Sequence, residues 1–235
     1  MAATEGKVAV VTGGNRGIGR GIAESLASEG LTVALTARDG AAAREAATQI
    51  GHGARGYACD VRRQAHVAAL FAAIEKDLGG VDVLVNNAGI GLFAPVAEMS
   101  VEDWHAVIET NLNGMFYCTR EAIPRMKKRG GGYIFNLSSL AGRNAFPGAS
   151  AYCASKHAVN GFSEVLFQEI RDLGIRVTYL MPGSVATAFG SGTTAKQGWA
   201  LQPEDVGEMV VDLLRTNPRA MHSRVEMRPS RPKRG

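Results

Sequence analysis

Short apolar runs alternate with amphipathic segments along the whole length of this 235-residue chain. Several of the runs are rich in β-branched residues and apolar on both faces, as buried strands of a parallel sheet must be. The candidate strands are 7–12, 31–36, 54–59, 81–86, 132–138, 175–181 and 223–228. The candidate helices between them are 17–29, 40–50, 63–78, 101–128, 151–173 and 203–216. This alternation predicts crossover units and an α/β fold: a doubly wound, seven-stranded parallel sheet with helices on both faces.

The chain shows no internal division. No repeat, low-complexity linker or charge block interrupts it, so residues 1–235 are expected to form a single domain. The one long segment without periodicity is 183–202, which is rich in small residues and follows a strand at the edge where open α/β sheets bind ligands. We expect it to be a substrate loop that closes over the site, although a plain connector would have a similar composition.

The composition excludes several classes of protein. No apolar stretch approaches the ~18 residues needed to span a bilayer, and the N-terminus lacks the basic-then-apolar layout of a signal peptide. Cys59, Cys118 and Cys153 are scattered without metal-type spacing, which indicates free thiols in a reducing cytoplasm and no bound metal. We therefore expect a cytoplasmic protein without a membrane partner.

The net charge of +4 arises at the C-terminal end. Residues 219–235 contain six basic side chains and one acid, for +5, so the rest of the chain has 20 basic and 21 acidic side chains, or −1. A basic tail could contact nucleic acid, but a solvated terminus is the simpler interpretation. Residues 229–235 contain two prolines and no apolar periodicity, so we expect a mobile tail and no nucleic-acid partner.

The first strand runs directly into a glycine cluster, TGGNRGIG, that opens the first helix. Gly13, Gly17 and Gly19 would let the backbone turn tightly and approach a pyrophosphate, whose charge is met by unpaired N–H groups of the helix. A glycine cluster alone is weak evidence, but this one follows a strand and precedes a helix in the first crossover unit. The sequence therefore predicts a dinucleotide site, the alternative being a glycine-rich turn without a ligand.

The end of the second strand discriminates between nicotinamide cofactors. An NAD site needs a carboxylate there to accept from the adenosine ribose. The sequence has Arg38, and a guanidinium at this position, with Arg16 from the glycine loop, would pair with a 2′-phosphate. Asp39 follows directly, and a shift of one residue would restore an acid. We expect NADP(H) to be preferred, with NAD(H) as the less favoured cofactor.

Tyr152 and Lys156 lie four residues apart in the expected helix 151–173, so they share a face. A free phenol has a pKa near 10 and is a poor base at neutral pH. An ammonium ~5 Å away, at an effective dielectric of ~20, would favour the phenolate by about 3 kcal/mol, or roughly two pKa units. The pairing is therefore expected to lower the pKa of Tyr152 towards the range useful for proton transfer.

In these motifs, taken in order, the chain resembles the short-chain dehydrogenase/reductase family over nearly its full length. TGGNRGIG is similar to the family's cofactor loop, CDV at 59–61 to its adenine contact, and NNAG at 86–89 to the motif after its fourth strand. PGSVAT at 182–187 is similar to the segment that lines the nicotinamide. The resemblance implies a Rossmann-type fold and these cofactor-binding residues: Gly13, Asn15, Arg16, Gly17, Ile18, Gly19, Arg38, Asp60, Val61, Asn87, Ala88, Gly89, Tyr152, Lys156, Pro182, Gly183, Val185 and Thr187.

The resemblance also implies a catalytic tetrad, formed by Asn111, Ser139, Tyr152 and Lys156. Ser139 is chosen because it lies thirteen residues before Tyr152, the family spacing. Hydride would pass from the nicotinamide to a carbonyl carbon while Tyr152 protonates the oxygen and Ser139 stabilises its charge. Lys156 would also hold the nicotinamide ribose, and Asn111 would bind a water that relays protons to Lys156.

Three functions remain open at this stage. The first is an NADPH-dependent reductase of ketones or aldehydes that can also run as an alcohol dehydrogenase. The second is a 3-oxoacyl-thioester reductase of fatty-acid synthesis, weakened because the chain ends in SRVEMRPSRPKRG rather than in a glycine pair and a short apolar terminus. The third is a nucleotide-sensing or RNA-binding module that has lost the reaction, for which a broken tetrad would be expected; here all four positions are filled.

The sequence also suggests an assembly and a pocket. The family commonly pairs the helices at 101–128 and 151–173 into a four-helix interface, which implies a homodimer or homotetramer. Phe162, Val165, Leu166 and Ile170 offer an apolar stripe for it. Phe93 and Phe146 each follow a motif by a few residues and are candidate walls of a pocket for a small-molecule substrate, as is Trp199 in the loop. His157 and Cys153 are offset from the Tyr152–Lys156 face, and we expect them to pack or lie at the surface.

Overall fold

A computed structural model describes residues 6–189 and 198–231 of the chain. All seven expected strands are present: β1 (Val8–Val11), β2 (Thr32–Ala37), β3 (Arg55–Ala58), β4 (Val83–Asn86), β5 (Gly132–Leu137), β6 (Ile175–Pro182) and β7 (Arg224–Met227). They form one sheet in the order β3-β2-β1-β4-β5-β6-β7, and every neighbouring pair is parallel. This is the doubly wound arrangement that the alternating pattern predicts.

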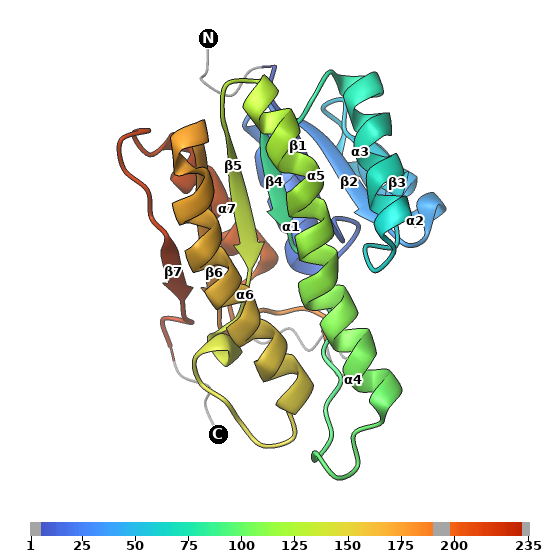
Figure 1. Cartoon of the computed structure of the whole chain (residues 1–235), viewed down its shortest axis with the longest axis vertical. Helices are drawn as coiled ribbons and strands as arrows, with labels where there is room; N and C mark the ends of the chain where they lie inside the picture. Colours follow the sequence, from blue (N-terminus) through green and yellow to red (C-terminus); the bar gives the residue numbers. More distant parts are fainter. Residues whose placement is uncertain (1–5, 190–197, 232–235) are drawn as a thin grey trace.

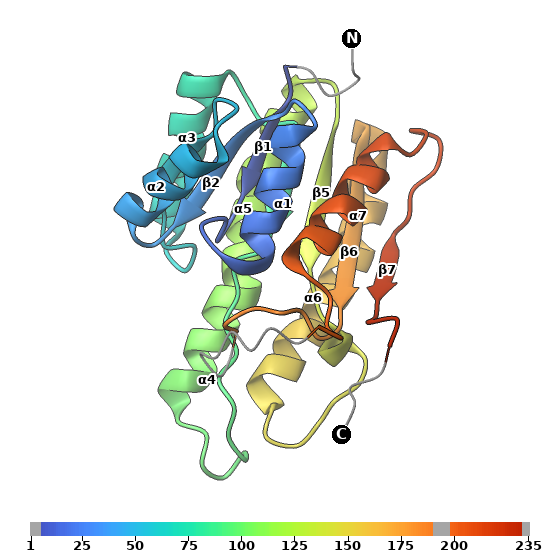
Figure 2. The same cartoon turned by 180° about the vertical axis from the view of Figure 1, so that it is seen from behind.

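The helices cover both faces of this sheet. They are α1 (Gly17–Ser28), α2 (Gly40–Ile50), α3 (Gln64–Leu78), α4 (Val101–Ile108), α5 (Gly114–Lys128), α6 (Ser150–Ile170) and α7 (Pro203–Arg215). Figure 1 shows α3, α5 and α6 in front of the sheet, and Figure 2 shows α1, α2 and α7 over the opposite face. Residues of these two sets of helices pack into two separate buried clusters.

Strand β1 shows why the central strands are apolar on both faces. Ala9 and Val11 pack in the cluster with α1, α2 and α7, while Val8 and Val10 pack in the cluster with α3, α5 and α6. All four are buried. Successive side chains of a strand point to opposite faces, so a strand covered by helices on both sides needs apolar residues at every position.

The expected helix 101–128 is interrupted. Residues Glu109–Asn113 form a π-helical turn between α4 and α5. The helical backbone therefore continues from α4 to α5 through one turn that is wider than an α-helical turn. The expected helix 151–173 is α6 followed by a 3₁₀ turn at Arg171–Leu173. A second 3₁₀ turn, Leu140–Gly142, follows β5. Single π-turns inside α-helices are rare and often mark a functional position.

Two segments bear on the expected loop and tail. Of the substrate loop 183–202, residues 190–197 lie outside the described part of the chain. Its two ends meet, because Val185 and Leu201 form an isolated parallel bridge and Ala186 N–H donates to Leu201 O. Of the expected mobile tail, residues 232–235 lie outside the described part. No helix among the described residues is long and apolar enough to cross a membrane.

Candidate active site

The glycine loop lies at the carboxyl end of β1, beside the point where the strand order reverses between β1 and β4. Gly13 and Gly17 have φ of +64° and +54°, values that side-chain-bearing residues rarely adopt. A Cβ on Gly19 would overlap the side chain of Asn87 and the carbonyl of Gly13. Asn15 and Ile18 are partly exposed in the same loop, and Ile18 packs against the core.

The N-terminus of α1 keeps its backbone donors available. Its N-cap residue, Arg16, is extended and provides no side-chain cap, and the first turn has no acidic residue. The helix therefore presents unpaired N–H groups and the positive end of its dipole to the loop, the arrangement that binds a phosphate group. Arg16 itself is exposed.

The NNAG motif is bound directly to the glycine loop. Thr12 Oγ1 accepts from the backbone N–H groups of Asn87 and Ala88, both at 3.0 Å. Asn87 Nδ2 donates to the carbonyls of Thr12 at 2.9 Å and Gly13 at 3.2 Å. These bonds hold the loop after β4 and the glycine loop as one unit, although 74 residues separate Asn87 from Gly13.

The acid that follows Arg38 has a structural role. Asp39 is the N-cap of α2, and its Oδ1 accepts from the backbone N–H of Ala41 at 2.8 Å and of Ala42 at 3.3 Å. Such a cap stabilises the helix by about 1 kcal/mol and points the carboxylate at its own helix. Arg38 is the first residue after β2 and is exposed. A guanidinium therefore occupies the position at which NAD sites use an acid.

Asp60 is paired with a neighbour that the sequence interpretation did not consider. Arg62 binds both of its carboxylate oxygens, with Nη2–Oδ2 at 2.6 Å and Nε–Oδ1 at 2.9 Å. The hydrogen bonds from Arg62 and the nearby charge of Arg38 lower the pKa of Asp60. Val61 is buried, and a Cβ on Gly114 would overlap its side chain, so α5 begins in contact with this segment.

The segment 182–187 lies over the glycine loop. Pro182 ends β6, and Gly183 N–H donates to Met227 O at 2.9 Å. Thr187 contacts the glycine loop, since a Cβ placed on Gly17 would lie 3.4 Å from Thr187 Cγ2. Val185 packs against the same cluster as Ile18. Two motifs that are far apart in sequence therefore lie next to each other.

Tyr152, Lys156 and Ser139 come together at the carboxyl end of β5. Tyr152 and Lys156 lie on the first two turns of α6, with Lys156 Nζ 5.7 Å from the Tyr152 ring centroid. Ser139 is extended, and its hydroxyl accepts from Ala141 N–H at 3.1 Å. The same hydroxyl lies close enough to Tyr152 to favour a lower pKa of the phenol. Lys156 is buried and donates from Nζ to Leu137 O at 2.7 Å.

The expected effect of Lys156 on Tyr152 is not found. Burial raises the pKa of Tyr152, and the hydrogen bond from Ser139 only partly opposes this. Burial also lowers the pKa of Lys156 to about 8. The charge–charge estimate from sequence neglected the loss of water around both groups, which penalises each charged form. Tyr152 is therefore a protonated phenol at neutral pH, suited to donate a proton.

Asn111 is buried in the π-turn and is tied to two other segments. Its Oδ1 accepts from Ile90 N–H at 2.8 Å, and its Nδ2 donates to Ile90 O at 2.9 Å and to Ser155 Oγ at 3.0 Å. Ser155 Oγ in turn donates to the main-chain carbonyl of Tyr152. Gly89 lies against Asn111, because a Cβ there would be 3.3 Å from Asn111 Oδ1. Both amide hydrogens of Asn111 are thus used by protein groups.

Aromatic side chains from two loops contact the ring of Tyr152. Phe93 contacts the Tyr152 ring, and Phe146 contacts Phe93. Phe189, which no motif singled out, contacts the Tyr152 ring from the loop after β6. Cys153 is buried with Ala149, and His157 is exposed with Nδ1 2.8 Å from Cys153 O, so neither joins the tetrad. The segment of Trp199 follows the undescribed residues, and the ring is partly buried.

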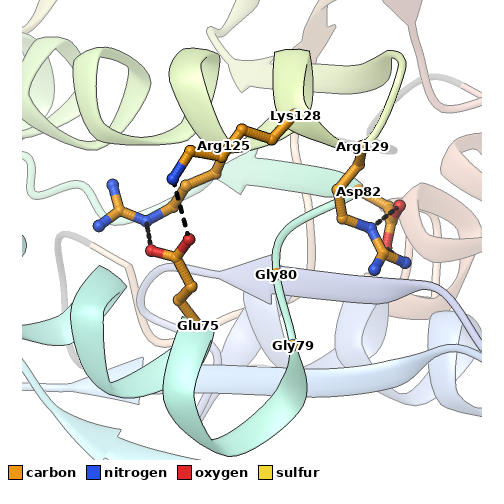
Figure 3. A pocket seen from close by; sticks show the side chains of 7 residues that line it. All are labelled: Glu75, Gly79, Gly80, Asp82, Arg125, Lys128 and Arg129. Atoms are coloured by element: carbon orange, nitrogen blue, oxygen red, sulfur yellow. Dashed lines mark hydrogen bonds and ion pairs between the residues drawn. The ribbon is translucent and has the colours of Figure 1, made fainter.

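A separate hollow of about 350 Å³ lies at the opposite, amino edge of the sheet. Figure 3 shows how ion pairs line it: Arg125 and Lys128 both reach Glu75, and Arg129 pairs with Asp82. It contains none of the expected site residues. Because its cations are already paired with carboxylates, it connects the ends of α3 and α5 rather than forming part of the candidate active site.

Comparisons with known proteins agree with this geometry. Residues 7–198 match the family model described as short chain dehydrogenase. The D-threitol dehydrogenase of Mycolicibacterium smegmatis is 41% identical over 79% of this chain and 73% of its own, and the 3-oxoacyl-[acyl-carrier-protein] reductase of Haemophilus influenzae is 36% identical over 82% and 80%. The crystal structure of a metagenomic short-chain oxidoreductase in complex with NADP has 36% identity and a TM-score of 0.86, and covers 97% of this chain and 99% of its own.

The family model spans the glycine loop, the NNAG motif and the Tyr152–Lys156 pair. The chain is an oxidoreductase that belongs to the short-chain dehydrogenase family.

Proposed function

We propose that this protein reduces the carbonyl group of a ketone or aldehyde with NADPH, and that it can catalyse the reverse oxidation of the alcohol. The observation that carries this proposal is the convergence of Tyr152 and the Ser139 hydroxyl at the carboxyl edge of the sheet, the edge that also carries the glycine loop. A proton donor and a neutral hydrogen-bond donor next to a dinucleotide site are what carbonyl reduction requires of a protein.

The residues present fit a nicotinamide dinucleotide. The glycine loop brings backbone close to the space below Thr187, and the bare N-terminus of α1 offers N–H donors to a pyrophosphate. When bound, the cofactor supplies the hydride. Lys156, with two ammonium hydrogens beyond the one given to Leu137 O, would donate to the ribose, and Val185 and Thr187 would border the nicotinamide.

NADP(H) is favoured over NAD(H) by the charges at the adenosine end. Arg38 is exposed and available to a 2′-phosphate, while the Asp39 carboxylate is already used as a helix cap. The solved relative that binds NADP is consistent with this preference. Asp60, which the resemblance assigned to the adenine, can fill that role only while it also bonds to Arg62.

The proton-donor role of Tyr152 follows from its environment. Burial raises the pKa of its hydroxyl above the ordinary value near 10, so it carries its proton at pH 7, and the Ser139 hydroxyl lies beside it. As an alkoxide develops, the Tyr152 proton moves to it, and the Ser139 hydroxyl turns its one hydrogen from Tyr152 to the same oxygen. Both amide hydrogens of Asn111 are committed, so a water that relays protons to Lys156 would donate to the second lone pair of Asn111 Oδ1 or to a main-chain carbonyl of the π-turn.

A 3-oxoacyl thioester is the second candidate substrate, because the Haemophilus influenzae relative acts on that class by name. One experiment separates the two. Ketones, aldehydes and acyl thioesters are assayed with NADPH and with NADH, and product formation is followed by loss of the reduced cofactor's absorbance. Reduction of ketones with NADPH that disappears in Tyr152→Phe supports the proposal. Reduction of thioesters but not of ketones would favour the thioester reductase. If no substrate is reduced and the protein binds RNA, a non-enzymatic role would be favoured.

A further inference from the structure

Two phenylalanine side chains contact the ring of Tyr152, and a third contacts one of these two. The ring of Phe93 meets it edge-on at a centroid distance of 5.7 Å, and the ring of Phe189 lies 5.5 Å from it on a tilted plane. Phe146 lies 6.2 Å from Phe93 and extends the group. We call Phe93, Phe146 and Phe189 the aromatic wall.

The aromatic wall is assembled from three loops that follow neighbouring strands. Phe93 lies after β4, Phe146 after β5 and Phe189 after β6, and these strands are adjacent in the sheet. An isolated bridge between Ala94 and Ala149 joins the first two loops. Gly91 makes room for the third, because a Cβ there would lie 2.8 Å from the ring tips of both Phe93 and Phe189.

These rings are not part of the core. Phe93, Phe146 and Phe189 expose 46%, 49% and 44% of their surface, values unusual for phenylalanine. Apolar surface in water is costly by about 25 cal/mol per Å², and a cluster of it beside a reactive group is typical of a ligand-binding wall. An apolar ligand that covers the rings would recover this free energy.

The same loops provide little to recognise a charged or polyhydroxylated substrate. Within residues 87–100, 140–149 and 183–189, all of which the structure describes, the charged side chains are Glu98 and Arg143. Arg143 is already paired with Glu226, which also holds Arg228. Among these described residues, a phosphate or carboxylate near Tyr152 would therefore meet no cation without a carboxylate partner.

We propose that the aromatic wall binds an aryl or similarly flat apolar substituent of the substrate, so that the preferred substrates are ketones with an aromatic side group. This inference rests on the proposed carbonyl reduction and names its substrate class. Aromatic rings would pack on Phe93 and Phe189 edge-to-face or offset, with the carbonyl oxygen directed to Tyr152 and Ser139.

The test compares two ketones with the same reacting group. Benzylacetone is butanone with a phenyl ring on its far carbon, so the two carbonyls have similar intrinsic reactivity. We expect kcat/KM for benzylacetone to exceed that for butanone by at least about 10-fold, since the ring transfers apolar surface out of water. Hydroxybutanone, which carries a hydroxyl in place of the ring, should be no better than butanone.

Variants connect the preference to the wall. Phe146→Ala and Phe189→Ala should each lower the ratio of kcat/KM for benzylacetone to kcat/KM for butanone by about 5- to 10-fold. Val96→Ala removes an exposed apolar side chain from the loop of Phe93 and serves as the control; it should change neither substrate. Equal losses for both ketones in the phenylalanine variants, or no preference in the wild type, would overturn the inference while leaving carbonyl reduction intact.

A binding measurement separates this inference from the proposed chemistry. Calorimetric titration of benzylacetone into the NADP⁺ complex of Tyr152→Phe reports on the wall without turnover. We expect binding that Phe146→Ala weakens by a similar factor when added to that variant. If the wild type reduced no carbonyl and this binding was still observed, the proposed function would fail and the aromatic site would stand. If neither the wild type nor Tyr152→Phe bound benzylacetone, the aromatic site would be refuted.

Discussion

Lys156 Nζ donates a 2.7 Å hydrogen bond to the main-chain oxygen of Leu137, the last residue of β5. The ammonium is thereby positioned by the backbone of a central strand and not by a carboxylate. Because burial already lowers the pKa of Lys156 to about 8, a small change in its surroundings alters its charge near physiological pH. The same contact fixes the first two turns of α6, and with them Tyr152, relative to the sheet.

Removing the Tyr152 hydroxyl should abolish turnover without removing the cofactor. We expect Tyr152→Phe to lower kcat by at least about 10²-fold, because the proton donor is lost, while NADPH still binds through the glycine loop. Stopped-assay kinetics and fluorescence titration of NADPH measure the two effects. Near-normal kcat in the variant would contradict the proton-donor role.

The stability of the protein should carry a pH dependence due to Lys156. Its pKa is about 8 in the folded chain and 10.5 as a free side chain, so the unfolded state binds more protons between these values. Stability therefore rises with pH from about 8 to 10.5, by on the order of 1–3 kcal/mol. Urea unfolding of the wild type and of Lys156→Met measures this effect. The free energy of unfolding of the wild type should rise relative to that of the variant as the pH increases across this range.

The loss of the Leu137 hydrogen bond in Lys156→Met shifts that difference by a constant and does not change its slope. Wild-type and variant stabilities that run parallel from pH 7 to pH 10 (about three units, spanning most of the titration) would mean that the folded pKa of Lys156 is not depressed.

The cofactor preference should depend on Arg38 and not on the neighbouring acid. We expect Arg38→Asp to raise KM for NADPH at least about 10-fold more than KM for NADH, since a charged pair with the 2′-phosphate is replaced by repulsion. Asp39→Ala is the matched control: loss of the α2 cap should reduce stability by about 1 kcal/mol and leave the NADPH/NADH ratio unchanged. A ratio that responds to Asp39 instead would reverse the assignment.

Assembly should depend on the exposed apolar surface of α5 and α6. Phe116 on α5 exposes 43% of its surface and Val165 on α6 exposes 54%. We expect the wild type to form dimers or tetramers, and Val165→Lys to shift it towards the 24.8 kDa monomer, measured by light scattering. Val96→Lys, the same substitution at an exposed valine in the loop before α4, should leave the mass of the assembly unchanged. A wild type that is monomeric at micromolar concentration would refute the interface.

The strand pattern was readable because a parallel sheet covered on both faces demands apolar residues at nearly every position. The ends of β5 and β6 fall within one residue of the expected ends, as at Leu137 and Pro182. The expected apolar stripe on α6 indicates a subunit interface less clearly than the strand pattern indicates the sheet. Leu166 and Ile170 are buried against the sheet in the helix's own core cluster, and only Val165 of the four remains exposed. Periodicity shows that a face is apolar but not what covers it.

The π-turn at Asn111 could not be predicted from the same periodicity. The segment around it has a continuous helical pattern, and the widened turn goes with hydrogen bonds to Ile90 and Ser155, which are distant in sequence. The direction of the Tyr152 pKa shift was wrong for a related reason. A spacing of four residues gives the separation of two groups but not the amount of water around them, and burial is the larger effect.

The ties of Asn111 also bear on how such a protein could acquire new substrates. Its amide connects the loop that begins at Ile90 to the helix that carries Tyr152, through Ser155. The anchor lies before Phe93, so residues beyond it can change in size or number while the proton-donating helix keeps its place. The placing of this helix is in this way independent of the loop residues beyond Phe93, and those residues can diverge without loss of the bonds that Asn111 makes.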